Sequence, residues 1–514
     1  MEKYLIGTDI GTSGTKSVII DLNGRILAED YRTYMMICDK AGWAQQNAVD
    51  WQRAAFDTIA AVIRKSQVDY RNISAMCVSG LFAGSGVPVD GDINPLHDAI
   101  IWMDRRAIRQ KEEVDKIVDA KELFKITGNR NDAYFGFNKM LWIRDNKPEI
   151  WSKIRYFLPS NTYVVYKLTG EIAVDITSAA NIGGIYDFGM NSWSSQLLEQ
   201  LGIPNSMLPA NLMEPGDVAG YVTAKAAAQT GLPVGIPVCA GCTDCLASNL
   251  AAGVIEEKQQ SAIMGTSINW SILHKNKPTF PELVSMPNVT ESKSMIYTYG
   301  GVSTAGALTN WFLNTLAPYT IKGSRILPTT YKILESEASA IPAGCQGLLS
   351  FPGFMGERSP LWDSAARGIF CGLTLGHSRA HMYRALLEST AFAVRLIRES
   401  STIFLSSDNK CIVSGGASQS SLWLQIIADV NNTKIIRTSN NVQAPVGDAL
   451  VAGVSCGEIR DYSIIHDWCR YENAIEPDKR KYDMYTKLFE HYKHIYYNTR
   501  ANVEAIGALS CEND

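Results

Sequence analysis

The sequence predicts an α/β fold divided into two domains. Its 514 residues exceed what one hydrophobic core usually holds. Short apolar runs that end in glycine alternate with helical patterns, as in α/β sheets. Two similar hairpin patterns, at 4–21 and 260–273, place Gly-Thr-Ser between strands and indicate a duplicated fold. We therefore expect an N-terminal domain over 1–252 and a C-terminal domain over 253–514.

The first hairpin carries the residues around which the rest of the chain is organised. Asp9 closes the first strand, and Gly11 and Gly14 allow close approach of another group to the backbone. Such a turn can form an anion nest, and an acid beside it suggests Mg²⁺ and nucleotide phosphates. An ordinary Gly-rich hairpin fits the turn equally well, and the Walker A spacing is absent. The polar residues of the turn are Thr12, Ser13, Thr15 and Lys16.

Composition excludes several classes of protein. The chain is 46% apolar and 19% charged, with a net charge of −4, so it lacks the basic surplus that holds nucleic acid. No apolar run reaches the roughly 18 residues of a membrane span, and no signal peptide precedes the strand at Tyr4. The 11 cysteines are scattered, which favours a reducing cytoplasm. Cys239, Cys242 and Cys245 have no fourth ligand nearby, so we expect them to pack rather than bind metal.

The first half reads as strands and helices in alternation. A third strand follows the hairpin, Asp50 is a good N-cap for the next helix, and helix 137–144 stops before Pro148. The expected strands are 25–32, 73–79 and 99–101, a strand and turn are expected over 170–178, a new segment starts at 218–222, and the expected helices are 51–65, 109–125, 137–144 and 224–230.

Aromatic and charged residues follow the strand that begins at Ala99. An indole face beside a carboxylate suits a polyol, because C–H groups stack on the ring and hydroxyls bond to the acid. Spacing alone favours the plainer interpretation of a core Trp102 beside a solvated Asp104 and Arg105.

A second candidate acid, Asp244, lies where an apolar strand gives way to a small-residue helix. A carboxylate at such a junction points into a crevice and could accept a proton from a hydroxyl nucleophile. The local sequence is also that of an N-cap, which is the commoner role.

The second half repeats the alternation. Leu348–Arg358 is an apolar, Gly-rich loop, Glu388 lies inside an apolar helix face, and Gly415-Gly416 ends a strand. His491 and His494 lack a third ligand nearby and are expected at the surface. The expected helices are 307–316, 381–400, 421–431, 445–453 and 478–497.

Six ordered motifs together make the chain resemble the FGGY carbohydrate kinases, and within that family the xylulokinases. The likeness runs from about Tyr4 to Gly457, and it is the order of the motifs that makes it specific. The motifs are Asp9–Lys16, Trp102–Arg105, Gly241–Gly253, Met264–Ser267, Gly356–Pro360 and Ser414–Ser418.

The resemblance implies two actin-like ATPase domains of the ribonuclease H type, with an active site in the cleft between them. It implies ATP-dependent phosphorylation of a hydroxyl of a small sugar, with Asp244 as catalytic base and Asp9 as the acid that serves Mg²⁺. Substrate contacts are implied for Leu81, Phe82, Trp102, Asp104 and Asp244. Nucleotide contacts are implied for Thr12, Ser13, Lys16, Gly265, Thr266, Gly306, Asn310, Gly415, Gly416 and Ser420.

The chain departs from the xylulokinase pattern beside the sugar. Xylulokinases typically carry Gln-Met-His-Gly where this sequence has Leu81-Phe-Ala-Gly84. Loss of a histidine donor and gain of Phe82 remove hydrogen-bonding capacity, to which hydroxyl-reading sites are sensitive. The departure bears on which sugar binds and not on phosphoryl transfer.

Several alternatives stay open. The substrate could be ribulose, a polyol, a deoxy-sugar or an autoinducer-like ketone instead of a pentulose of the xylulose type. An ATP-binding actin-like protein without turnover is a weaker alternative, since it would not need Asp244. The expected partners are the sugar and ATP, with no nucleic acid and no membrane, a homodimer is allowed, and the expected location is the cytoplasm.

Overall fold

The computed structural model describes residues 2–40, 42–81, 83–275, 277–278, 280–317, 328–405, 409–438 and 443–511. The chain forms two compact units. Unit 1 contains Met1–Glu257, Leu273–Tyr297 and Val442–Arg470, and unit 2 contains Lys258–Ile272, Thr298–Asn441 and Tyr471–Asp514. The domain boundary expected between residues 252 and 253 stays a prediction. The compact units are assembled from interleaved segments.

Unit 1 is built on a seven-stranded mixed sheet in which β5 and β1 are central. β1 pairs antiparallel with β2 and parallel with β5, so the opening hairpin is as the sequence predicts. Apolar residues on both faces of β1 are fully buried, including Leu5, Ile6 and Ile10. In strand order the sheet is β13 (Val218–Tyr221), β14 (Pro237–Cys239), β5 (Ile73–Gly80), β1 (Tyr4–Ile10), β2 (Gly14–Asp21) and β3 (Ile26–Thr33), with β15 (Cys242–Thr243) pairing with β5.

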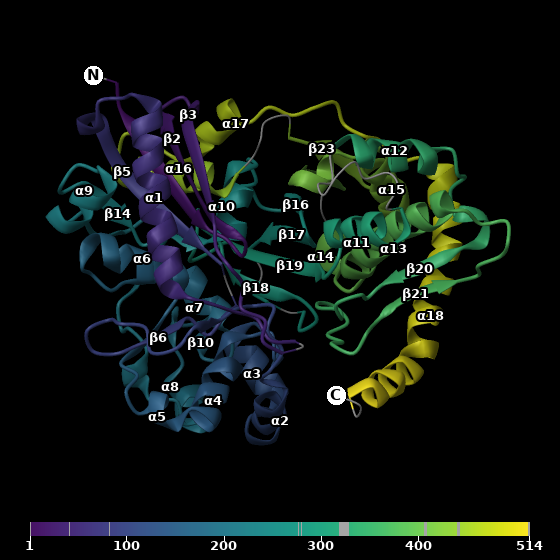
Figure 1. Cartoon of the computed structure of the whole chain (residues 1–514), viewed down its shortest axis with the longest axis horizontal. Helices are drawn as coiled ribbons and strands as arrows, with labels where there is room; N and C mark the ends of the chain where they lie inside the picture. Colours follow the sequence, from purple (N-terminus) through teal and green to yellow (C-terminus); the bar gives the residue numbers. More distant parts are fainter. Residues whose placement is uncertain are drawn as a thin grey trace. The chain divides into compact units, whose positions relative to one another are not determined.

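Helices cover this sheet and extend beyond it. Figure 1 shows α1 lying along the strands β2 and β3, which it contacts. The N-cap of α1 is Asn47, whose side chain accepts from the Val49 amide, so the expected cap Asp50 is wrong. The helices of unit 1 are α1 (Ala48–Ser66), α2 (Ile108–Ile117), α3 (Ala120–Thr127), α4 (Gly136–Asn146), α5 (Pro148–Trp151), α6 (Ser160–Thr169), α7 (Ile176–Ile182), α8 (Ser195–Leu201), α9 (Ala224–Thr230), α10 (Asp244–Ala251), α16 (Ala444–Ser455) and α17 (Ile465–Trp468).

Two expected elements of unit 1 are different in the structure. The helix expected over 109–125 is two helices, because Asp119 caps a new helix through the Lys121 and Glu122 amides. The segment 170–178, expected as a strand and turn, becomes helical at Ile176 because Asp175 accepts from the Ser178 amide. Short two-stranded pairings complete the unit: β4 (Gln45–Gln46) with β7 (Ala99–Ile100), β6 (Val87–Val89) with β8 (Tyr156–Leu158), β9 (Val174–Asp175) with β12 (Leu212–Met213), and β10 (Tyr186–Asp187) with β11 (Ser192–Trp193).

The second large sheet repeats the connectivity of the first. β16 pairs antiparallel with β17 and parallel with β22, as β1 does with β2 and β5. Its strand order is β18 (Val284–Pro287), β19 (Ile296–Val302), β17 (Ile268–His274), β16 (Gln260–Met264), β22 (Lys410–Ser414) and β23 (Lys434–Arg437), and a separate pair joins β20 (Leu349–Pro352) to β21 (Gly368–Cys371).

The helices of unit 2 include a long buried one and a long C-terminal one. α13 carries the buried Glu388, which accepts from Arg384 Nε at 2.9 Å and from the Tyr485 hydroxyl at 2.8 Å. In Figure 1, α18 runs beside β20, which it contacts, and it extends beyond the expected end at 497. The helices are α11 (Gly306–Leu316), α12 (Pro328–Ser339), α13 (Arg379–Glu399), α14 (Thr402–Leu405), α15 (Ser421–Asn431) and α18 (Lys479–Cys511). Across the described residues, every helix is too short or too polar to cross a lipid bilayer.

Candidate functional site

Three carboxylates gather at the end of β5 in unit 1. Strand register explains this for two of them, because Asp9 on β1 and Cys242 on β15 both align with Ser79 on β5. Asp244 follows two residues after Cys242 and is the first residue of α10. Thr243 occupies the N-cap position, so the Asp244 side chain is not used as the cap. Asp448, on α16, is fully buried.

Ser79 connects two of these acids. Its hydroxyl lies 3.2 Å from Asp9 Oδ1 and 2.8 Å from Asp448 Oδ2. A hydroxyl carries one proton, so both contacts are filled only when one of the two carboxyls is protonated and donates to Ser79. Burial, followed by the charge of Asp9, raises the pKa of Asp448 well above its ordinary value. Asp448 is therefore the acid that keeps its proton.

The remaining two acids also hold protons more tightly than usual. Burial raises the pKa of Asp9 to about 7, against a lowering by the Ser79 hydrogen bond. Burial, and then the charge of Asp9, raises the pKa of Asp244 well above the ordinary value for aspartate. A carboxylate with a raised pKa is a stronger proton acceptor, which is what a general base requires.

The oxygen atoms of this group fit a small hard cation. Within the described part of the chain, Asp244 Oδ1 and Asp448 Oδ1 are buried and accept no hydrogen bond. No group of three or more His, Cys, Asp or Glu residues among the described residues could by itself hold a metal. Mg²⁺ is commonly held by one or two carboxylates together with substrate phosphates, so Asp9 and the neighbouring Asp244, with its unbonded oxygen, fit that ion, whereas the protonated Asp448 does not.

The turn between β1 and β2 is fastened through its carbonyl groups. The Tyr34 hydroxyl donates to the Gly11 carbonyl at 2.5 Å, and Gln46 Nε2 donates to the Thr12 carbonyl at 2.5 Å. In a trans peptide the N–H points opposite to the C=O, so the Thr12 and Ser13 amides point away from these donors. A Cβ at Gly11 would have no contact closer than 3.4 Å. The turn thus presents two amides, as an anion site requires.

The related turn of unit 2 is fastened in the same way by a helix. The Gly306 amide donates to the Gly265 carbonyl at 3.0 Å, and the Ala305 and Ala307 amides donate to the Thr266 carbonyl. These donors at the start of α11 have no partner within the helix, so the turn caps it. The peptide groups that follow Gly265 and Thr266 therefore turn their own N–H groups away from α11.

The other nucleotide residues expected in unit 2 are distributed around this turn. A Cβ at Gly415 would lie 2.4 Å from the Met264 carbonyl, which places the end of β22 against the end of β16. Cβ atoms at Gly265 and Gly416 would meet nothing within 4 Å, so both residues border open space. Asn310 is exposed on α11 and accepts from the Tyr331 hydroxyl.

Two polar residues expected at the nucleotide already have protein partners. Ser420 caps α15 by accepting from the Trp423 amide at 3.2 Å, and its hydroxyl donates to Glu335 Oε1 at 3.0 Å. Lys16 pairs with Glu29 at 2.9 Å and lowers the pKa of that acid. Their expected contacts with nucleotide stay predictions.

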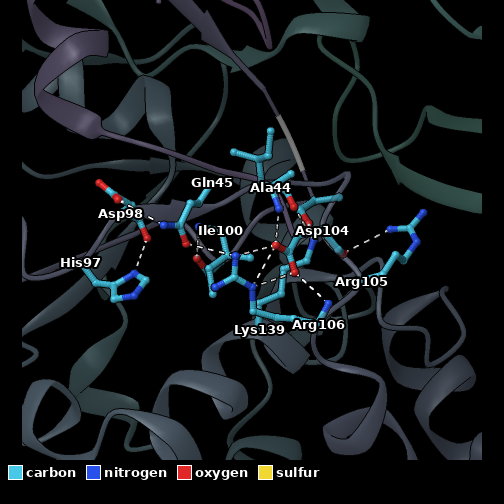
Figure 2. Close-up of polar contacts among 12 residues, drawn as sticks. Ala44, Gln45, His97, Asp98, Ile100, Asp104, Arg105, Arg106 and Lys139 are labelled. Atoms are coloured by element: carbon cyan, nitrogen blue, oxygen red, sulfur yellow. Dashed lines mark hydrogen bonds and ion pairs between the residues drawn. The ribbon is translucent and has the colours of Figure 1, made fainter. Parts of the chain in front are cut away.

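Among the residues expected to contact substrate, Asp104 is enclosed by protein donors. It is fully buried, and its oxygens accept from Arg106 and, at 2.5 Å, from the Ala44 amide (Figure 2). The Arg106 guanidinium stacks over Trp43 at 3.7 Å and over Trp142 at 4.9 Å. In this structure Asp104 fastens the loop that follows β7, and its expected contact with substrate stays a prediction.

Lys139 holds three substrate-side segments together. Its ammonium group is buried and donates to the carbonyls of Ala83 at 2.9 Å, Ile101 at 2.9 Å and Tyr134 at 2.7 Å. Burial lowers the pKa of Lys139 well below its ordinary value. Trp102, next to Ile101, is half-buried and meets the Tyr134 ring edge-on.

Leu81 is buried at the end of β5, where its amide donates to the Ile10 carbonyl at 2.8 Å. It lines a small, mostly apolar pocket together with Ala83, Gly84 and Ile101. Phe82, the other residue of the departure from the xylulokinase pattern, lies outside the described residues.

Several residues of this site were missed by sequence reasoning. Ser79 and Asp448 join the acids only through strand register and through a helix far along the chain, so no local pattern marks them. Tyr34 and Gln46 act on backbone carbonyls, which leave no sequence signal. Asp448 had one cue, an aspartate inside the small-residue segment 445–453.

Comparison with known proteins gives consistent matches over nearly the whole chain. The family described as "FGGY family of carbohydrate kinases" matches with its N-terminal domain over residues 4–251 and its C-terminal domain over 261–456. The xylulose kinase of Bacillus subtilis is 31% identical over 505 residues, covering 97% of each chain. The gluconokinase of the same organism is 25% identical, covering 91% of this chain and 90% of its own.

Solved structures match at the level of the fold. The crystal structure of a xylulose kinase from Rhodospirillum rubrum has a TM-score of 0.86 and 27% identity, covering 98% of this chain and 100% of that one. The agreement over both halves shows the same two-domain fold.

Proposed function

Because the chain belongs to the FGGY family of carbohydrate kinases, we propose that it phosphorylates a hydroxyl of a pentulose with Asp244 as the general base. As a member of this family the protein is an ATP-dependent carbohydrate kinase, and its sequence and fold are similar to those of xylulose kinases. The identity of the base rests mainly on one observation. Asp244 lies at the strand–helix junction, two residues after Cys242, which aligns with Ser79 as Asp9 does, and one of its oxygens, which is buried, accepts no hydrogen bond among the described residues.

The proposed reaction is an in-line transfer. Asp244 takes the proton of the sugar hydroxyl, and the hydroxyl oxygen forms a bond to the γ-phosphorus of ATP. The bond between that phosphorus and the β–γ bridging oxygen breaks, and ADP leaves. Most of the catalysis in such a transfer comes from positioning and from charge neutralisation, which the two fastened turns can supply.

Asp9 would hold Mg²⁺, which supplies positive charge to the phosphates when it is bound. Thr12, Ser13 and Lys16 would contact phosphate from unit 1. In unit 2 the proposed nucleotide residues are Gly265, Thr266, Gly306, Asn310, Gly415, Gly416 and Ser420. The open space beside Gly265 and Gly416 supports this placement, because a ligand can approach the backbone there.

The substrate is proposed to be D-xylulose or a close relative. Two relatives at comparable coverage carry the names xylulose kinase and gluconokinase, so the fold alone does not select the sugar. Trp102 offers a half-buried indole for stacking, and Asp104 is proposed as a sugar contact from the family motif alone, since its oxygens already accept from Ala44 and Arg106. The Leu81–Gly84 segment favours a substrate that needs fewer hydrogen bonds at this wall.

A panel of sugars tests the proposal. Purified protein with Mg²⁺ and ATP is given D-xylulose, D-ribulose, gluconate, glycerol and a deoxy-ketose, and ADP release is followed. We expect the highest kcat/KM for a pentulose. Activity confined to another compound would reject the pentulose, and binding of ATP without turnover on any of them would favour a non-catalytic protein. A cytoplasmic location and a homodimer stay predictions.

A further inference from the structure

A direct hydrogen bond links the proposed sugar side of unit 1 to its proposed phosphate turn. The indole N–H of Trp102 donates to the hydroxyl oxygen of Thr12 at 3.0 Å. The two residues come from the loop after β7 and from the turn between β1 and β2. The hydrogen bond itself is observed, and the inference drawn from it rests on the proposed function for the identity of the two ligands, a sugar and a nucleotide.

We propose that Trp102 is a positioning residue, which orients the Thr12 hydroxyl toward phosphate and thereby makes sugar binding and nucleotide binding cooperative. The inference concerns how the two ligands communicate, and it does not depend on which sugar binds.

The chemistry of a hydroxyl carries the first step. A threonine hydroxyl has one proton to donate and lone pairs to accept. When the indole N–H occupies a lone pair, the hydroxyl's own proton is left to donate elsewhere, and the accepted bond polarises it. A phosphate oxygen near the Thr12 and Ser13 amides is a suitable acceptor.

The backbone of the turn gives the second step. The Gly11 and Thr12 carbonyls are already held by Tyr34 and Gln46, and Gln46 is itself held by Trp51 through a 3.0 Å hydrogen bond. Tyr34 and Gln46 therefore fix the orientation of these two peptide groups independently of Trp102. The Thr12 side chain is the part of the turn whose orientation depends on Trp102.

The setting of the Trp102 ring gives the third step. The ring is half-buried and meets Tyr134 edge-on, with centroids 6.4 Å apart, and the Trp102 carbonyl accepts from Arg105 at 2.9 Å. A sugar stacked on the indole would restrict the ring further and so hold its N–H at Thr12. The second ligand then meets a turn that is already ordered, and by linkage the effect is the same in both directions.

The test is a measurement of coupling. The dissociation constant of a non-hydrolysable ATP analogue with Mg²⁺ is measured with and without saturating D-xylulose, or the panel sugar with the highest turnover. We expect sugar to tighten nucleotide binding about tenfold in the wild type. In Trp102→Phe, which keeps an aromatic face but lacks the N–H, the ratio should fall close to one.

Variants of the acceptor separate positioning from simple loss of contact. Thr12→Val removes the hydroxyl and should abolish the coupling, and adding Trp102→Phe to it should change the coupling no further. Thr12→Ser keeps the hydroxyl and should restore it. Trp193→Phe is the matched control, because its indole N–H donates to the Pro209 carbonyl at 2.8 Å elsewhere in unit 1, and its coupling should equal that of the wild type.

The outcomes discriminate between the two proposals. Sugar turnover in a wild type that shows no coupling, or full coupling in Thr12→Val, overturns this inference and leaves the kinase assignment intact. Absence of turnover on every sugar overturns the proposed function instead. If Trp102→Phe fails to fold by circular dichroism, the comparison of Thr12→Val with Thr12→Ser decides the question.

Discussion

At the residue scale, three aspartates lie close together, and each binds its proton more tightly than an exposed aspartate does. Ser79 bonds to Asp9 and Asp448, Asp244 lies close enough to Asp9 to feel its charge, and burial raises the pKa of each acid. A buried carboxylate without a partner is costly unless a proton or a cation neutralises it. The arrangement therefore suits a site that receives a hydroxyl proton and a divalent cation.

The neutral state of Asp448 gives a prediction about stability. Its folded pKa lies above its unfolded pKa, so the folded state binds more protons, and this acid destabilises the fold progressively as pH rises above the unfolded value. Asp448→Asn removes that effect and can still donate to Ser79. We expect the variant to gain stability relative to wild type between pH 5 and pH 8, by roughly 1.4 kcal/mol for each pH unit in which the folded acid keeps its proton.

Urea unfolding at the two pH values, with EDTA present, measures this difference. An advantage for Asp448→Asn that is equal at both values, or larger at pH 5, would contradict the protonated state of Asp448. Asp467→Asn, on α17 and exposed, is the matched control for the chemical change from aspartate to asparagine.

At the scale of elements, the β1–β2 turn and the β16–β17 turn are held in the same way. Hydrogen bonds to their carbonyl groups leave their amide groups facing away from those donors. Tyr34 supplies one of the donors in unit 1, and the start of α11 supplies them in unit 2. Sequence reasoning located both turns because Gly-Thr-Ser between two apolar strands is a local signal. It could not find the donors, because Tyr34 and Gln46 reach the first turn only after the chain has folded.

Loss of one such donor should weaken nucleotide binding selectively. Tyr34→Phe frees the Gly11 carbonyl and removes a hydrogen bond of about 0.5–1.5 kcal/mol, so we expect KM for ATP to rise about three- to tenfold. KM for the sugar should change less than twofold. Tyr4→Phe is the control, because Tyr4 begins β1, at the end of the strand away from the turn, and its hydroxyl donates to Glu2. Equal effects of the two changes on KM for ATP would argue against a role of the Tyr34 hydrogen bond in orienting the turn.

Lys139 is the corresponding support on the substrate side. Lys139→Met leaves the carbonyls of Ala83, Ile101 and Tyr134 without this donor, and each unsatisfied buried group costs about 1–3 kcal/mol. We expect a loss of at least about 3 kcal/mol in the free energy of unfolding. Lys167→Met removes one hydrogen bond, at 3.1 Å to the Ile93 carbonyl, and cation–π contacts with Tyr163 and Tyr166, from a less buried position, and it should cost less than Lys139→Met because only one carbonyl loses its donor. Chemical denaturation compares them, and similar costs would be evidence against the role of Lys139.

Element boundaries were harder to predict than the elements themselves. The strands of both hairpins and helix 421–431 follow directly from periodicity and β-branched content. The break at Val118–Asp119 and the helical turn after Asp175 depend on aspartates that cap through side-chain hydrogen bonds. Such caps compete with the surrounding periodic pattern, and the pattern alone does not show which of the two prevails.

At the scale of the whole molecule, the fold is more interleaved than the sequence indicates. Unit 1 takes back the segments Leu273–Tyr297 and Val442–Arg470 after the chain has entered unit 2. The contact is close, since a Cβ at Gly7 would lie 1.7 Å from the Pro445 carbonyl and one at Gly447 would lie 2.0 Å from the Ala247 carbonyl. Only tertiary structure reveals this return, whereas chain length and the repeated hairpin already predicted two domains.

This return predicts how a truncated chain behaves. A chain of residues 1–257 lacks α16, so β1 and α10 lose the helix that packs against them. We expect it to unfold at low urea without a cooperative transition. Appending residues 442–470 through a flexible Gly-Ser linker restores α16 and should raise the urea midpoint, as followed by circular dichroism. Cooperative unfolding of 1–257 at the same midpoint as the appended chain would contradict the dependence on α16.

The most direct test of the central claim is the rate of phosphoryl transfer in Asp244→Asn. Single-turnover measurements with D-xylulose and MgATP, or with the best sugar of the panel, separate chemistry from product release. If Asp244 accepts the hydroxyl proton, the rate falls about 10²- to 10⁴-fold while the dissociation constant of the ATP analogue stays within about threefold. A rate within about tenfold of wild type would show that another group takes the proton.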